Sequence, residues 1–250
     1  MRKIILFALC AALAAAFLCG CVSINLSPAF NNMASGGVVG KGDFASYSYS
    51  VGEITEIRTE LFCNIEYYSA ASDTVTLEIQ PNLHEYISVD ESDGILTVTT
   101  TRNISWSGNA PVLTVGTPSL KALSLSGAGQ FTAHDTITGD SFTLRMDGAG
   151  SGTAKLDVNS LTANMSGASN FELSGRADNA SVTMSGAGAV NALQLDTRDA
   201  SVSLAGVGTV RIGCSGILKI NADGMGTVEY KGSPSIDINK GGFVNVKKVG

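Results

Sequence analysis

A strand, a glycine cluster and a second strand recur every 16 to 21 residues through the second half of the chain. The clusters read SGAG, DGAG, SGAS, SGAG, AGVG, DGMG and, in degraded form, NKGG. We align the repeats on the first residue of each cluster, which we call the anchor. The anchors are Ser126, Asp147, Ser166, Ser185, Ala205, Asp223 and Asn239. Positions one and three before each anchor, and five and seven after it, are nearly all apolar. A unit this short cannot bury its apolar side alone, so the repeat predicts units stacked on one another.

The alternation of apolar and polar residues inside each unit defines the predicted fold. Side chains alternate across a strand, so the four apolar columns must face one interior. Parallel crossovers take the right hand. We therefore predict an all-β protein built as a right-handed parallel β-helix, a single-stranded β-solenoid, with rungs about 4.8 Å apart. A leucine-rich repeat has a similar period, but its LxxLxLxxN signature and its helical segment are missing from the sequence.

The residues before the repeats also favour strands. Glu53–Tyr68, Asp73–Gln80 and Gly94–Thr101 alternate apolar and polar side chains, which predicts β-strands. Asn82–Val89 is compatible with a single helical turn. Ser105–Ser119 reads as two short extended pieces broken by turns.

The N-terminus has the features of a targeting segment. Arg2 and Lys3 precede an apolar run, Ile4–Leu18, which is short for a membrane span. The run ends in LCGC, which is similar to a bacterial lipobox, where cleavage precedes the cysteine that receives lipid. We predict that residues 1–20 are a lipoprotein signal peptide and that Cys21 is lipidated; an ordinary secretory signal is the alternative. Several acyl chains would anchor the protein stably to the membrane.

These features predict the domain organisation and the location. Val22–Ser50 is rich in Ser, Asn, Gly and Ala, which indicates a flexible tether. We assign residues 21–46 to this tether and 47–250 to the body. Within the body, 47–119 would form opening strands and 120–250 seven glycine-cornered rungs. The predicted location is the bacterial cell envelope, with the lipid in the outer membrane.

Charge and cysteine content exclude several kinds of partner. The formal charge is −6, and it becomes −8 when residues 1–20, with two positive and no negative charges, are removed. An acidic chain with no basic run is not expected to bind nucleic acid. Cys63 and Cys214 remain in the body, where they could pair or, as we expect, stay separate buried thiols. The only histidines are His84 and His134, so no metal-ligand spacing and no cofactor are predicted.

The glycine clusters could in principle bind phosphate or calcium. A phosphate loop needs a following helix, whereas a strand follows each cluster here. Calcium-binding repeats need an Asp at positions that are occupied by core residues in this chain. We expect structural corners, because glycine allows close backbone approach and positive φ. The predicted corner glycines are Gly127, Gly129, Gly148, Gly150, Gly167, Gly186, Gly188, Gly206, Gly208, Gly224 and Gly226.

Catalysis would require carboxylates close together on one face. Glu172 and Arg211 lie two rungs apart, and Asp147 and Asp223 lie four rungs apart, so neither pair predicts a site. The far loops carry Asp residues interspersed with Lys155, Arg176 and Arg198, and these Asp residues are Asp135, Asp140, Asp157, Asp178, Asp196 and Asp199. We interpret that edge as solvated and mixed in charge, and His134 beside Asp135 as a surface pair. No catalytic residue is predicted.

The same residues carry a family resemblance. LKALSLSGAG (Leu120–Gly129), the SGAG and DGMG corners, GTVEYKGSP (Gly226–Pro234), EITEI (Glu53–Ile57) and GILTV (Gly94–Val98) resemble the putative auto-transporter adhesin "head GIN" domain family, over roughly residues 53–250. The resemblance implies a right-handed β-helix of pectin-lyase-like architecture without that superfamily's catalytic residues. It also implies a role in adhesion or surface interaction. Neutral residues follow the corners in place of the family's commoner Asp, so a role for acidic residues there would not transfer.

Three functions are compatible with these patterns. The first is a non-enzymatic, lipid-anchored envelope protein whose β-helix faces bind a glycan or protein surface through Ser, Thr and Asn rows. The second is a carbohydrate-active enzyme with a degenerate site near the far-loop aspartates. The third is a purely structural spacer. The sequence predicts no binding column and no oligomeric state.

Overall fold

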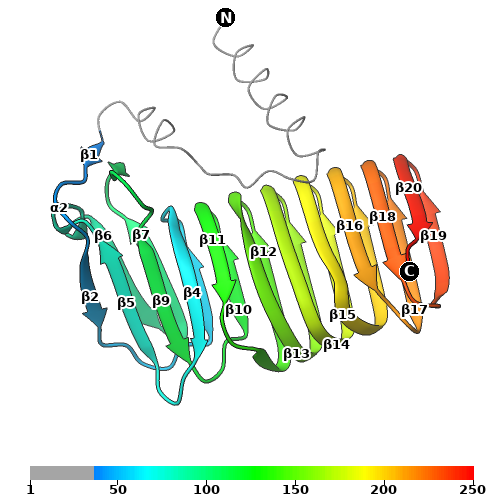
Figure 1. The fold of residues 1–250 in the computed structure, drawn as a ribbon, viewed down its shortest axis with the longest axis horizontal. Helices are drawn as coiled ribbons and strands as arrows, with labels where there is room; N and C mark the ends of the chain where they lie inside the picture. The colour runs from blue at the N-terminus through cyan, green and yellow to red at the C-terminus, as the bar shows by residue number, and fades with distance from the viewer. Residues whose placement is uncertain (1–36) are drawn as a thin grey trace, which may run out of the picture.

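A computed structural model describes residues 37–250 as a nearly all-β molecule whose parallel strands stack into a solenoid of about seven turns (Figure 1). The predicted all-β parallel solenoid is therefore confirmed. The predicted signal peptide, Cys21 and the first part of the tether lie outside the described residues. The only helix among residues 37–250 has four residues, and none there could cross a membrane.

The repeats form eleven consecutive strands, which lie side by side along the long axis of the molecule (Figure 1). They are β10 (Ala122–Leu125), β11 (Ala128–Ala133), β12 (Ile137–Met146), β13 (Ala149–Met165), β14 (Ala168–Met184), β15 (Ala187–Leu204), β16 (Val207–Gly213), β17 (Ile217–Ala222), β18 (Met225–Lys231), β19 (Ser235–Lys240) and β20 (Phe243–Lys248). All pair in parallel. We call the two-residue breaks at the glycine clusters corners. The strand segments before the corners form the pre-corner sheet, and those after them form the post-corner sheet.

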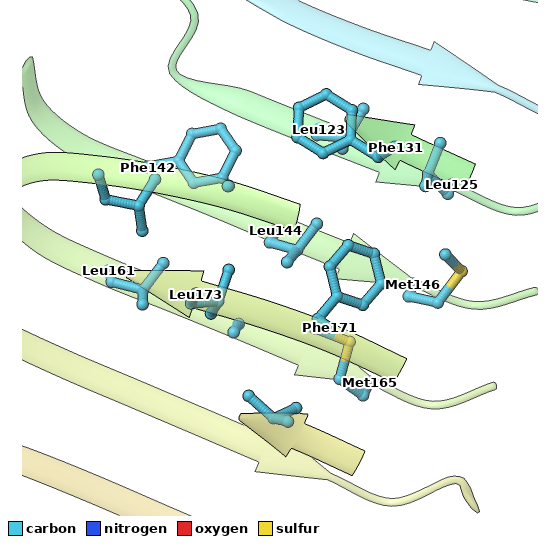
Figure 2. Packing of buried hydrophobic residues seen from close by; sticks show 14 of the residues in the cluster. Leu123, Leu125, Phe131, Phe142, Leu144, Met146, Leu161, Met165, Phe171 and Leu173 are labelled. Atoms are coloured by element: carbon cyan, nitrogen blue, oxygen red, sulfur yellow. The ribbon is translucent and has the colours of Figure 1, made fainter. Parts of the chain in front are cut away.

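The interior is filled by the predicted apolar columns. Leu123 pairs with Leu144, and the column continues through Ala163, all of them fully buried (Figure 2). One column holds two large rings, Phe131 and Phe171, on either side of Gly152. A Cβ at Gly152 would lie 2.3 Å from the Phe171 ring. The glycine therefore provides the volume that the aromatic ring occupies.

The corner glycines stack on one another along the solenoid. A Cβ at Gly148 would lie 1.7 Å from the carbonyl oxygen of Gly127, and one at Gly186 would lie 1.9 Å from that of Gly167. Close backbone approach excludes a side chain in this column. At Gly188 a positive φ of 138° adds a second requirement for glycine.

The last rung has a different register from the one that the sequence alignment predicts. Ala222 pairs with Lys240 and Ile220 pairs with Ile238. Gly241, and not Asn239, therefore occupies the anchor position. The predicted register was wrong by two residues, which leaves every side chain on the same face of the strand, so the apolar pattern could not reveal the shift.

An additional rung precedes the repeats. β3 (Glu56–Thr59) pairs with β10, and β4 (Cys63–Ser69) pairs with β11, all in parallel. On the other side, β3 pairs with β7 (Ile95–Thr100) and β4 pairs with β9 (Val112–Thr117). The predicted strand region Glu53–Tyr68 is thus broken by a corner and lies between two rungs that follow it in sequence.

Antiparallel strands and one helical turn close the N-terminal end. β5 (Thr74–Ile79) joins β2 (Ala45–Tyr49) to β9, and β6 (Ile87–Ser92) pairs with β7. The helical turn predicted within Asn82–Val89 is α2, Pro81–His84, which begins earlier at a proline in its first turn. Its Leu83 is fully buried.

The body begins earlier than the predicted boundary at residue 47. β1 (Val38–Val39) pairs in parallel with β8 (Ile104–Ser105), and Lys41 N–H donates to Asn82 Oδ1 at 2.7 Å. Residues 37–46 are therefore held by hydrogen bonds and belong to the body. A Gly- and Ser-rich composition did not show this because the partners lie more than thirty residues away.

Candidate ligand-binding face

The outward side chains of the post-corner sheet form one continuous column along the molecule. From the N-terminal end, the in-register residues are Thr114, Glu66, Thr132, Thr153, Glu172, Asn191, Arg211, Glu229 and Lys247. We call this column and its neighbouring outward residues the polar face. Its middle combines the neutral Thr132, Thr153 and Asn191 with the carboxylate of Glu172, and its C-terminal part is ionic.

The C-terminal part of the polar face is satisfied by ion pairs. Arg211 Nε donates to Glu229 Oε2 at 2.7 Å, and Lys247 Nζ lies 3.0 Å from Glu229 Oε1. The hydrogen bonds from Lys247 and Arg211 lower the pKa of Glu229. Arg211, which lies two rungs from Glu172 as predicted, is thus engaged with Glu229 of the following rung.

A shallow groove of about 420 Å³ crosses the middle of the polar face. Thr153, Lys155, Glu172, Ser174 and Asn191 supply its polar groups, and Ala133, Ala154 and Leu173 its apolar ones. The small side chains of Ala133, Thr153 and Ser174 leave this space open beside the longer Lys155 and Glu172. The groove combines donors, acceptors and both signs of charge over a few rungs.

A β-bulge lies beside the groove. Asn191 pairs with Glu172 and Gln194 pairs with Ser174, so β15 carries one residue more than β14 at this point. The extra residue explains why the repeat from Ser185 to Ala205 is 20 residues long. Bulges redirect side chains and are enriched next to functional sites.

Asn191 also carries an unsatisfied polar atom. Its Oδ1 is buried and has no hydrogen-bond partner within residues 37–250. A buried acceptor without a donor raises the free energy of the folded protein by about 1–3 kcal/mol. The side chain lines the groove, so a hydroxyl or N–H group of a ligand in the groove could satisfy it.

An aromatic pair lies next to the groove. Tyr68 and His134 stack with ring centroids 4.4 Å apart and an interplanar angle of 6°. Tyr68 is 38% exposed, and His134 directly follows the groove residue Ala133. Glu66 Oε2 lies 3.5 Å from the Tyr68 hydroxyl and 3.7 Å from His134 Nε2. We call Glu66, Tyr68 and His134 the aromatic platform.

The sequence predicts a surface pair of His134 and Asp135, whereas in the structure His134 stacks on Tyr68. Asp135 Oδ2 instead accepts a hydrogen bond from Ser69 N–H at 3.0 Å. Partial desolvation, followed by the nearby Glu66 carboxylate, raises the pKa of Tyr68, so its phenol remains a hydrogen-bond donor at neutral pH. One signal in the sequence points to Tyr68: in the pair Tyr67-Tyr68 at the end of a strand, alternation directs only one of the two rings inward.

The far-loop aspartates form local contacts and no common site. Asp178 pairs with Arg176 at 2.7 Å and Asp199 pairs with Arg198 at 3.0 Å, while Asp140 accepts from Asn159 at 3.1 Å. Among the described residues, no group of three or more His, Cys, Asp or Glu side chains could hold a metal ion. Asp147, at its exposed corner, accepts a hydrogen bond from Ser166 of the next rung.

The two body cysteines are separate, buried and free, as expected. Burial raises the pKa of the Cys63 thiol to about 12. Such a thiol is protonated at neutral pH and is not a nucleophile.

The fold and the polar face define a β-solenoid with a shallow polar groove on one sheet. Residues 54–234 match the family described as "Putative auto-transporter adhesin, head GIN domain". The chain belongs to this family of adhesin-like surface or envelope proteins. Comparison with curated proteins gives no match.

Solved structures share the fold. A putative adhesin from Bacteroides fragilis has a TM-score of 0.80 and 22% identity, with 85% of this chain and 100% of that chain covered. A putative lipid binding protein from Parabacteroides distasonis has a TM-score of 0.71 and 20% identity, with 85% of this chain and 99% of that chain covered. A putative adhesin from the same species has a TM-score of 0.64 and 19% identity, with the same coverage.

Proposed function

We propose that this protein is a non-enzymatic, lipid-anchored adhesin of the bacterial envelope that binds glycans on the polar face. The observation that carries the proposal is the groove, which is lined by Asn191 with its unsatisfied Oδ1 and lies beside the aromatic platform. Sugars present both C–H faces, which pack on aromatic rings, and hydroxyls, which pair with amide and carboxylate groups. The groove and platform supply both kinds of contact within a few rungs.

The spacing of the carboxylates favours binding over hydrolysis. Glu66 and Glu172 lie in one column with Thr132 and Thr153 between them, so their strands are roughly 14 Å apart. Glycosidases need two carboxyl groups within about 5–10 Å. The two glutamates can therefore contact different sugar units of one chain but cannot act together on one bond.

A glycan array tests the proposed ligand class. Wild-type protein is expected to retain a subset of polysaccharides, and a Tyr68→Ala, Asn191→Leu variant to lose at least tenfold in affinity. The retained glycans are also analysed for shorter products. Absence of binding to any glycan would contradict the proposal, and cleavage products would replace it with a degenerate carbohydrate-active enzyme.

Lipid anchoring is tested separately at the N-terminus. A Cys21→Ala variant expressed in bacteria is expected to lose labelling by a fatty-acid probe. Protease shaving of whole cells then reports whether the body faces outward, as an adhesin must. Retained labelling in the variant would refute the assignment of Cys21.

A further inference from the structure

The two ends of the solenoid differ in how they are closed. Antiparallel strands and α2 cover the N-terminal end, whereas β19 and β20 form the C-terminal end (Figure 1). Within residues 37–250, β19 pairs only with β17, and β20 only with β18. The outer edges of both strands therefore present backbone N–H and C=O groups with no ladder partner.

The core is uncovered at this C-terminal end. Ile236 and Ile238 pair with Leu218 and Ile220, which are 0% and 1% exposed. Ile236 and Ile238 are 37% and 46% exposed, because no strand within residues 37–250 lies beyond β19. Phe243 at the adjacent corner is 87% exposed. Repeat proteins normally close such an end with a polar cap.

Charge is distributed unequally along the axis. Residues 37–119, which build the N-terminal end, contain three Lys or Arg and eleven Asp or Glu, a formal charge of −8. Residues 224–250 contain four Lys and two Asp or Glu, a formal charge of +2. The basic C-terminal end of one copy is therefore complementary to the acidic N-terminal end of another.

We propose that copies of this chain associate head to tail, with β19 of one copy pairing antiparallel with β6 of the next. β6 is an edge strand that pairs only with β7 among the described residues, and it runs opposite to the parallel strands that lead to β19. The other N-terminal edge strand, β2, extends the post-corner sheet through β5 and β9. β6 and β19 are both edge strands of the pre-corner sheet, so the pairing is assigned to β6.

One register satisfies both packing and charge. It places Ile238 opposite Ile87 of the next copy and Ile236 opposite Val89, so that the uncovered core column meets the inward residues of β6. Lys240 then faces Glu85, which lies just before β6. The same register sets Asp237 opposite Ser88 and Ser235 opposite Asp90, and it brings no like charges together. A shift of two residues would place Asp237 opposite Asp90 and is disfavoured.

Such an interface is heterologous and leaves one free end of each kind. It therefore extends into an open filament. The groove and the aromatic platform would repeat along that filament. The inference rests on the ends of the fold and is independent of the proposed glycan site.

Disulfide trapping of the full chain in the bacterial envelope tests the register. Opposed outward residues in an antiparallel pair have Cβ atoms about 4.5–5.5 Å apart, close enough for a disulfide after small adjustment. An Asp237→Cys, Ser88→Cys double variant is expected to form a ladder of oligomers on a non-reducing gel. The off-register Asp237→Cys, Asp90→Cys variant is expected to form at least tenfold less disulfide-linked oligomer. Each single variant should stay monomeric.

Charge reversal supplies a second measurement that does not depend on a new disulfide. Lys240→Glu alone and Glu85→Lys alone are expected to weaken self-association, and a mixture of the two variants to restore it. A disulfide dimer from Asp237→Cys alone would overturn the proposal in favour of end-on pairing of two C-terminal ends. Exclusively monomeric protein in all double variants, with unchanged circular dichroism, would also overturn it.

Discussion

The corners require glycine mainly because there is no room for a side chain beside the backbone, and less because glycine is flexible. At Gly186 a side chain would collide with the carbonyl oxygen of Gly167, which neither rung can move without breaking its ladder. Glycine therefore recurs in the sequence because successive rungs are in close backbone contact at each corner. This also explains why six clusters keep a glycine directly after the anchor.

The first prediction compares two adjacent corner residues. Gly186→Ala is expected to lower the free energy of unfolding by about 3 kcal/mol or more, because its Cβ overlaps a backbone oxygen. Ser185→Ala, at the exposed neighbouring position, should change it by less than about 0.5 kcal/mol. Thermal and urea denaturation measure both, and equal effects would contradict the packing described for the corner.

The second prediction concerns the buried thiol of Cys63. Its pKa is raised from 9.0 to about 12 in the folded state, so its contribution to stability is complete below pH 9 and is lost as the pH rises towards 12. From pH 7 to pH 10 the wild type should lose on the order of 1 kcal/mol more stability than Cys63→Ala. Urea denaturation at both pH values measures this, and identical pH dependence in the two proteins would refute it.

At the scale of elements, the repeat could be predicted because each rung carries its own corner and its own apolar columns. The rung of β3 and β4 could not be placed, because its corner, Glu60–Phe62, lacks a glycine cluster. Its partners also lie more than 30 residues along the chain. The same distance conceals the candidate site: Tyr68 and His134 are 66 residues apart, and nothing local to either predicts their stacking.

A third prediction tests how this inserted rung is held. Phe62, at its corner, stacks on Trp106 with ring centroids 4.8 Å apart. A double-mutant cycle with Phe62→Ala and Trp106→Ala is expected to give a coupling energy of about 0.5–1.5 kcal/mol. Trp106 is the chain's single tryptophan, so its fluorescence should also shift in Phe62→Ala. Additive single effects would show that the stack does not couple the corner to the β8–β9 connection.

At the scale of the whole molecule, the solenoid separates several surfaces. The pre-corner sheet, the polar face and the two ends all rest on one core, so a ligand on the polar face need not compete with a second copy at an end. The groove and its bulge are the places where the regular repeat is interrupted, by an additional residue in β15 and by small side chains.

Blocking one sheet at a time tests whether the ligand site lies on the polar face. Thr153→Arg places a large side chain in the groove, and Thr183→Arg places the same side chain on the pre-corner sheet. Calorimetric titration with a glycan that binds the wild type is expected to show at least a tenfold loss of affinity for Thr153→Arg and none for Thr183→Arg. Unchanged binding in Thr153→Arg, or equal loss in both folded variants, would contradict a ligand site on the polar face.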